Sequence, residues 1–336
     1  MLGGCTGGGE NPQTLSSTLL LWSVDTVAIV GVADGDPQQE FGQLIAAEYG
    51  PHGDLALLDL RRPGVSWFDS VGRFQASTRV GRGPGELSQP RAIGSSASGA
   101  ILALDPASAR LSFLRATGGR VSLDSSIGTL HVSTSVCELA GRVYASFLLD
   151  GFVAHTLGPD GKARRSFGPE PSLPQATAGT FGLLARRQIV EPRLYCDERR
   201  SQVVLAGRSH PLVHAYDSLG QLKWSNRLDG VHSLAFRVND DGSVGGVLDS
   251  IHGASFARSM VAWDEQHLLV QYVRSFPGPP PETREFSAID SRLLNLTNGT
   301  EVERSERLPL VAAARGDRLV ILDNFPYPRA IVVRRR

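Results

Sequence analysis

The glycine-rich stretch VGRGPGELSQPRAIG (residues 80–94) has the residue types that could cradle a phosphate group. A phosphate-binding loop of the P-loop kind needs a Lys-Ser or Lys-Thr pair after its last glycine, and then a long helix. No such pair follows Gly85, and no helical period follows Pro90. We therefore expect this stretch to connect two strands. Its glycines would let the chain turn, and Pro90 would start the next strand.

A second candidate for chemistry is the pair His210 and His214, whose spacing puts both rings on one face of a strand. Zinc sites take three or four ligands, and the sequence offers no third ligand nearby. The acidic pair Asp240 and Asp241 lacks the later carboxylates of a calcium loop, and the chain has no G-x-S-x-G nucleophile motif. The sequence therefore predicts no catalytic residue, no metal ligand and no cofactor. Calcium or zinc in a central channel stays open as an alternative.

The chain contains three cysteines. Cys137 and Cys196 lie next to apolar residues, and we expect buried thiols rather than a disulfide. Cys5 follows small residues and precedes a glycine-rich segment, which resembles the cleavage site of a bacterial lipoprotein signal, where the cysteine becomes lipidated. The charged and apolar regions of a complete signal are missing, which a recorded start downstream of the real one would explain. An incidental thiol in a disordered N-terminus is the alternative.

The composition favours a soluble protein with many short strands. Of the 336 residues, 41% are hydrophobic and 20% are charged, and 37 glycines and 20 prolines interrupt short runs of apolar residues. Lys and Arg together number 34, as do Asp and Glu, so no net field attracts nucleic acid or an anionic membrane. We expect the terminal residues Arg334, Arg335 and Arg336 to be a solvated chain end.

A repeated unit runs along the chain. Each unit contains a short apolar run, and after most runs come a second strand, a tight turn and a third strand. The runs start at Leu55, Ile101, Val143, Val203, Leu268 and Leu319. A unit of about four strands in 40–50 residues is the size of one β-propeller blade. The sequence therefore predicts an all-β, six-bladed β-propeller. Seven blades and a long β-sandwich are the alternatives.

The two ends of the chain are expected to close the ring. Residues 328–333 read as a third strand with no fourth strand after it, whereas residues 22–31 read as a fourth strand with nothing before it. We infer that the N-terminal strand completes the last blade, which would remove two exposed sheet edges. The predicted domains are a flexible tether with the lipidation motif over residues 1–14 and a β-propeller over residues 15–336.

One blade resembles the NHL-type six-bladed propellers that are found in bacterial secreted proteins and lipoproteins. The resemblance is carried by Gly81–Glu86, Pro90, the strand Ile101–Asp105 and the strand Arg110–Leu114. Leu87 replaces the phenylalanine that is usual in this family, and Leu111 replaces an isoleucine. The resemblance implies the propeller fold. It leaves the activity open, because such propellers include binding proteins, lyases, hydrolases and lactonases.

Aligned blades suggest a basic ring. The positions ten residues before the six runs are Ile45, Arg91, Ser133, Arg193, Arg258 and Pro309. If this position starts the innermost strand of each blade, Arg91, Arg193 and Arg258 would lie near one mouth of the central channel. Guanidinium groups there could bind a carboxylate or a phosphate. Three solvated or ion-paired arginines are the alternative.

These patterns predict a non-enzymatic, envelope-associated β-propeller that binds a ligand or protein partner at one face. The alternatives are a metal-dependent hydrolase or lyase with a divalent ion in the channel, and a purely structural adaptor. We expect an unknown protein or an anionic small-molecule or carbohydrate ligand as partner, and no nucleic acid. We also expect a monomer that is secreted or held in the cell envelope, touching a membrane only through a lipid on Cys5.

Overall fold

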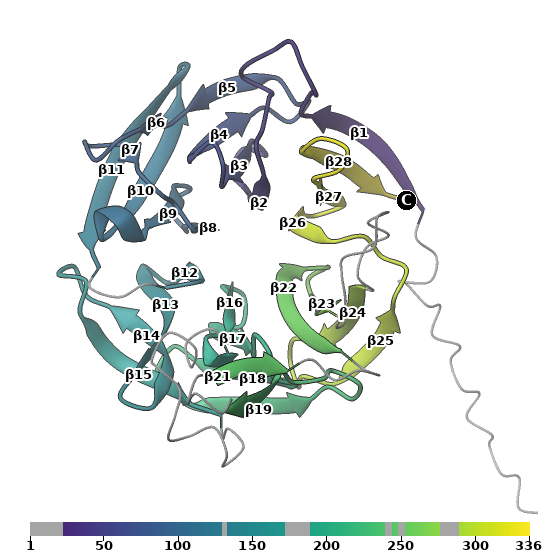
Figure 1. The fold of residues 1–336 in the computed structure, drawn as a ribbon. Coiled ribbons are helices and arrows are strands. Elements are labelled where there is room, and N and C mark those ends of the chain that lie inside the picture. Colours follow the sequence, from purple (N-terminus) through teal and green to yellow (C-terminus); the bar gives the residue numbers. More distant parts are fainter. Residues whose placement is uncertain (1–22, 130–132, 172–188, 239–243, 248–252, 276–288) are drawn as a thin grey trace, which may run out of the picture.

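The computed structural model describes residues 23–129, 133–171, 189–238, 244–247, 253–275 and 289–336. Within these residues, six four-stranded antiparallel sheets stand as blades in a ring around a central axis (Figure 1). This confirms the predicted all-β, six-bladed propeller. The predicted tether and its Cys5 lie outside the described residues.

The strands follow the same order in every blade, from the innermost to the outermost. Blade 1 contains β2 (Leu44–Tyr49), β3 (Leu55–Asp59), β4 (Gly64–Phe68) and β5 (Phe74–Ser77). Blade 2 contains β8 (Ala92–Ser95), β9 (Ile101–Asp105), β10 (Arg110–Thr117) and β11 (Arg120–Gly128), with the 3₁₀ helix η1 (Pro106–Ser108) after β9. Blade 3 contains β12 (Val136–Leu139), β13 (Arg142–Leu149), β14 (Phe152–Leu157) and β15 (Ala163–Pro169).

The remaining blades repeat this order. Blade 4 contains β16 (Arg193–Asp197), β17 (Gln202–Ala206), β18 (Leu212–Asp217) and β19 (Leu222–Arg227). Blade 5 contains β22 (Ala254–Ala262), β23 (His267–Ser275), β24 (Ile289–Asn295) and β25 (Glu301–Ser305). Blade 6 contains β26 (Val311–Arg315), β27 (Arg318–Asp323), β28 (Arg329–Arg335) and β1 (Val24–Val30). Two small pairs lie between blades, β6 (Arg79–Val80) with β7 (Glu86–Leu87), and β20 (Ala235–Val238) with β21 (Val244–Val247).

The core of the molecule lies between neighbouring blades. Along β17, Val203 and Leu205 pack against blade 3, where they meet Tyr144. The alternate residues Val204 and Ala206 pack in the opposite direction, against blade 5. Because successive side chains of a strand point to opposite faces, a strand between two blades must be apolar on both sides. This explains why the second strand of each blade reads as an apolar run.

The ring closes through the two ends of the chain, as the sequence predicted. β1 pairs antiparallel with β28, with Val24 opposite Arg335 and Val30 opposite Ala330. An ion pair between Arg336 Nε and Asp25 Oδ2, at 2.8 Å, stands where a covalent hairpin joins these strands in the other blades.

The expectation of a solvated arginine end holds for Arg334 and Arg336, which are exposed, but not for Arg335. Arg334 and Arg335 belong to β28, and the Arg335 guanidinium lies 4.4 Å from the ring centroid of Trp263 in blade 5. The reason is that the last strand must extend to the chain end to pair with β1.

The glycine-rich stretch at residues 80–94 is a structural connector between blades 1 and 2. The backbone N–H of Gly83 donates to Glu86 Oε2 at 2.9 Å. From β10, the Arg110 guanidinium donates to the carbonyl oxygens of Gly83 at 3.1 Å and Glu86 at 2.6 Å. These bonds use the polar groups of the loop internally, which confirms its predicted role as a connector.

A disulfide corrects the expectation of two buried thiols. Cys137 in β12 is bonded to Cys196 in β16, with their Cα atoms 5.8 Å apart. The two cysteines are 59 residues apart in the sequence, but the ring places the innermost strands of blades 3 and 4 side by side. The sequence lacks this information because the pairing is set by the packing of blades, not by local pattern.

Asp105 should be a strong determinant of the stability of blade 2. Its buried carboxylate accepts hydrogen bonds from Ser88 N at 2.6 Å, Gln89 N at 3.0 Å and Ser108 Oγ at 2.8 Å. Asp105→Ala should lower the free energy of unfolding by about 2–4 kcal/mol, because the buried donors lose their acceptor. Urea denaturation would measure this change. Asp124→Ala, which removes a half-exposed carboxylate of β11, should cost under about 1 kcal/mol. Equal losses for the two variants would contradict the assignment.

Candidate ligand site in the central channel

The innermost strands of all six blades surround one cavity on the central axis, which we call the channel cavity. Its volume is about 390 Å³, and its lining runs from Arg193 and Arg258 at one end to Glu138 and Glu198 at the other. This volume lies within the usual range of small-molecule sites. The cavity therefore reaches along the inner strands and is lined by every blade.

Three arginines gather where the innermost strands begin, and we call them the arginine cluster. Arg193 is the first residue of β16, Arg258 lies in β22, and Arg208 follows β17. Burial, together with the positive charges of Arg208 and Arg258, lowers the pKa of Arg193 to about 10. Burial and the charge of Arg258 also lower the pKa of Arg208, and Glu191 opposes this shift. The three charges therefore act on one another at one mouth of the channel.

Arg193 has no acidic partner within the described part of the chain. Its Nη1 donates a hydrogen bond to the carbonyl oxygen of Thr134, at 3.3 Å. A buried guanidinium is normally paired with a carboxylate, because burying an unpaired charge is costly. Arg193 lines the channel cavity and keeps donors that no carboxylate of the described residues uses, as an anion site requires.

The structure brings together two of the three arginines that the repeat alignment selected. Arg193 and Arg258 both line the channel cavity, whereas Arg91 is exposed and is not among the residues of that lining. Five residues separate the paired Ser95 and Ile101 of blade 2, but six separate the equivalent pair Cys196 and Val203. Arg91 therefore lies one residue further from the paired strand positions than Arg193 does. A shift of one residue along a strand turns the side chain to the other face of the sheet.

β-bulges direct several side chains into the cavity. The ladder of β22 is interrupted between Ala257 and Ser259, so Arg258 is the extra, unpaired residue. Ile45 in β2 and Ala312 in β26 are the extra residues of equivalent bulges, and all three line the cavity. A bulge re-aims its extra side chain. Arg258 therefore lines the channel because of a β-bulge that the sequence pattern did not predict.

Arg208 was missed by the sequence analysis. It lies in the turn between β17 and β18, whereas the repeat pattern compared only positions ahead of each apolar run. No spacing rule connects it with Arg193 or Arg258, and only the packing of blades 4 and 5 shows that it belongs to the cluster.

The opposite end of the channel cavity is acidic. Glu48, Glu138 and Glu198 line it, and we call them the carboxylate cluster. Burial raises the pKa of Glu48 to about 7, although hydrogen bonds from Ser95 and from the backbone of Tyr49 oppose the shift. Glu138 accepts a hydrogen bond from Ser96 Oγ. The channel is therefore electrostatically asymmetric, with positive charge where the inner strands begin and negative charge where they end.

The wall between the two charged ends is mostly apolar. Ile93, Val136, Leu194 and Met260 contribute to it. Cys137 and Cys196, which form the disulfide, also line the cavity. A ligand that enters between the charged ends thus meets aliphatic surface.

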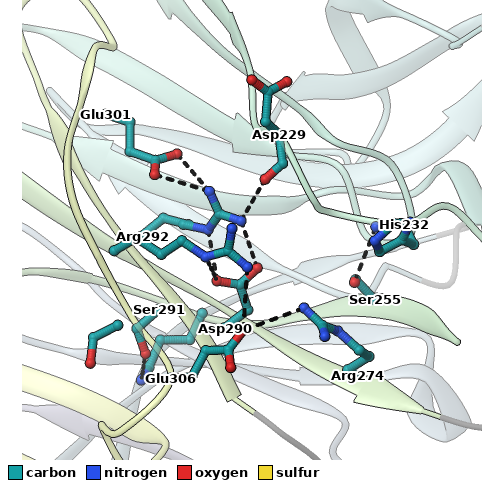
Figure 2. A network of polar contacts seen from close by, with 12 residues as sticks. Asp229, His232, Ser255, Arg274, Asp290, Ser291, Arg292, Glu301 and Glu306 are labelled. Carbon is teal, nitrogen blue, oxygen red and sulfur yellow. Dashed lines mark hydrogen bonds and ion pairs between the residues drawn. The ribbon is translucent and has the colours of Figure 1, made fainter. Parts of the chain in front are cut away.

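A second concentration of charge, in blade 5, is internally satisfied (Figure 2). Arg292 is buried, and its side chain donates five hydrogen bonds, two to Asp290, two to Glu301 and one to the carbonyl oxygen of Asp229. A guanidinium has five N–H donors, so none remains for a ligand. Arg304 also contacts Asp290, at 3.2 Å. This network ties β24 and β25 to the segment after β19 and is structural.

Two further features are absent from the described residues. No group of three or more His, Cys, Asp and Glu side chains there is arranged to hold a metal ion. None of the helices in that part of the chain is long and apolar enough to cross a bilayer.

Comparison with known proteins supports the fold. No protein-family model matches the chain, and no curated protein matches its sequence. A protein from Bacteroides fragilis NCTC 9343 that is named as an exported protein has a similar structure, with a TM-score of 0.59, 11% identity and coverage of 96% of this chain and 98% of that chain. A member of the DUF4221 family from Bacteroides vulgatus ATCC 8482 gives 0.54 at 10% identity, covering 93% and 99%. The Pan2 WD40 domain of Neurospora crassa gives 0.50 at 10% identity, covering 89% and 79%. At these identities the likeness concerns the fold, which is that of a β-propeller.

Glu48 should make the stability of the protein depend on pH. In the folded protein its pKa is raised from 4.5 to about 7, so the stabilising effect of the neutral form is complete below pH 4.5 and is lost as the pH rises to 7. Glu48→Gln removes this loss and should raise the free energy of unfolding at pH 8 by about 1–3 kcal/mol relative to the wild type. Urea denaturation at pH 5 and pH 8 would measure the difference.

The control for this measurement is Asp124→Asn, because Asp124 is half-exposed and lies outside the channel cavity. This variant should leave the difference in stability between pH 5 and pH 8 unchanged. A Glu48→Gln variant with the same pH dependence as the wild type would contradict the raised pKa.

Proposed function

We propose that this chain is an exported, non-enzymatic β-propeller that binds an anionic group at the arginine mouth of its central channel. The single observation that supports this most is the position of Arg193, which is half-buried beside Arg208 and Arg258 without an acidic partner among the described residues. A bound anion would offset the repulsion among the three guanidinium groups. The anion belongs to a small ligand or to a segment of a protein partner.

Carboxylate and phosphate groups fit this mouth best. A guanidinium presents N–H donors in a planar fork that matches the two oxygens of such an anion, and hydrogen bonds between charged groups are stronger than neutral ones. Partial burial of Arg193 strengthens its interaction further, because water competes less for its donors. Arg193 and Arg258 line the cavity directly, while Arg208 contributes its positive charge.

Three observations support an exported location. The disulfide between Cys137 and Cys196 is a bond that persists in oxidising compartments. A structural neighbour is named as an exported protein. The segment around Cys5 resembles a lipoprotein cleavage site, and we propose that this cysteine carries the lipid that anchors the propeller to the cell envelope.

The closer relationship that we propose is with the NHL-type propellers. It rests on the blade 2 sequence, in which the loop Gly81–Glu86 and Arg110 of β10 interact as one structural unit. No specific observation favours the metal-dependent hydrolase or lyase alternative, so we propose binding without catalysis.

Replacing the cavity-lining arginines should strongly weaken anion binding. The double variant Arg193→Gln and Arg258→Gln should bind citrate or inorganic phosphate at least ~30-fold more weakly than the wild type, because two charge-assisted interactions of about 1.5–3 kcal/mol each are removed. Isothermal titration calorimetry at low ionic strength would measure this. The melting temperature of the variant should not fall, since the mutual repulsion of the arginines is relieved.

Arg91→Gln is the matched control, because Arg91 was selected by the same sequence pattern but is exposed and outside the cavity lining. It should bind both anions as the wild type does. Undetectable binding of both anions by the wild type, or an equal loss of affinity in the control, would refute the proposed function.

A further inference from the structure

We propose that the channel takes a zwitterion, with its anionic group at the arginine cluster and a primary ammonium group at Glu48 and Glu138. This inference rests on the proposed function, whose anion site supplies one half of the recognition. It adds the other half, because the carboxylate cluster lines the same cavity as Arg193 and Arg258.

The carboxylates at the far end have no cationic partner among the described residues. The contacts of Glu48 come from Ser95 and from the backbone of Tyr49, and that of Glu138 comes from Ser96 Oγ. All of these donors are neutral. A carboxylate has about four lone-pair positions, so both groups keep acceptor capacity on the cavity side. An ammonium group, with three donors and a positive charge, would satisfy this capacity.

Arg193 and the two carboxylates share one feature, because each lacks a partner of opposite charge among the described residues. At one end of the cavity the half-buried Arg193 lacks an anion, and at the other end two carboxylates lack a cation, among the described residues. Within the described residues, no salt bridge of the protein joins the two ends. A ligand with both charges would complete both ends at once.

The register of the strands sets the distance between the two ends. Glu48 pairs with Ala56 in blade 1 as Tyr195 pairs with Val204 in blade 4, so Glu48 and Tyr195 lie at the same level. The charge of Glu48 also acts on Tyr195, as expected for two residues at the same level. Burial and the charges of Asp197 and Glu48 raise the pKa of the Tyr195 hydroxyl. Arg193 precedes Tyr195 by two residues, which corresponds to a rise of about 7 Å.

Glu138 lies one level further along the channel. It pairs with Val143, the first residue of its apolar run, as Cys196 pairs with Val203. Arg193 precedes Cys196 by three residues, which corresponds to a rise of about 10 Å. Along the channel, the two charges of the ligand should therefore be separated by about 7–10 Å, given a rise of about 3.3 Å per residue.

An extended peptide of two or three residues with free termini has this separation. The chain spans at most about 3.3–3.6 Å per residue, so its terminal ammonium and carboxylate are about 7–10 Å apart. The apolar middle of the cavity, with Ile93, Val136 and Met260, suits small aliphatic side chains. The tripeptide Ala-Ala-Ala is the simplest probe with these properties.

Calorimetric titration of the full chain with four probes tests the inference. The probes are Ala-Ala-Ala, its N-acetylated form, its C-terminal amide and citrate. The free tripeptide should bind, and each blocked form should bind at least ~10-fold more weakly, because one charge-assisted interaction is lost. The Glu48→Gln variant should weaken binding of the free tripeptide and leave citrate binding unchanged.

A matched control separates a specific effect from a general change in charge. Asp124→Asn removes a carboxylate outside the channel cavity and should bind the free tripeptide as the wild type does. Equal affinity for the acetylated and the free tripeptide, or an unchanged affinity of Glu48→Gln for the free tripeptide, would overturn the zwitterion inference. Citrate binding that depends on Arg193 would still support the anion site in that case. If the wild-type protein does not bind citrate either, the proposed function itself is refuted.

Discussion

The structure depends on one constraint, which is that each blade has two apolar faces and only a closed ring covers both. The second strand of every blade shows this directly, since Val203 and Val204 of β17 are both buried but pack against opposite neighbours. An open row of blades would expose one apolar face at each end. Pairing of β1 with β28 prevents this and joins the two ends of the chain in one sheet.

Ring closure also creates the channel. The innermost strand is the first of the four in blades 1 to 5 and is β26 in blade 6, and the six innermost strands surround the central axis (Figure 1). Residues that are far apart in the sequence therefore meet at the same level. Arg193 and Arg258 meet at the beginning of these strands, and Glu48 and Glu138 meet near their ends. The Cys137–Cys196 disulfide has the same origin, because it joins two neighbouring innermost strands.

The charged groups of the protein fall into two kinds, and their partners distinguish them. Arg292 uses all five of its donors on protein acceptors, and Arg110 holds the loop between blades 1 and 2. Such groups have no capacity for a ligand, and they stabilise the fold. Arg193 instead faces two other guanidinium groups. Withdrawing an unpaired charge partly from water is costly, so the large apolar core between the blades must offset it.

The sequence by itself determined the blade and the way the ring closes, and it favoured six blades over the seven that it left open. These features follow from short-range patterns, namely apolar runs, hairpin turns and a repeat of 40–50 residues, which local strand geometry reads directly. The tertiary structure decided which charges face the channel. Arg91 and Arg193 stand at the same distance from their apolar runs, yet a difference of one residue between paired strands turns only Arg193 into the cavity. Arg258 enters through a bulge, and Arg208 enters from a turn. Such placements depend on pairing register and on contacts between blades, and the local sequence pattern predicts neither of them.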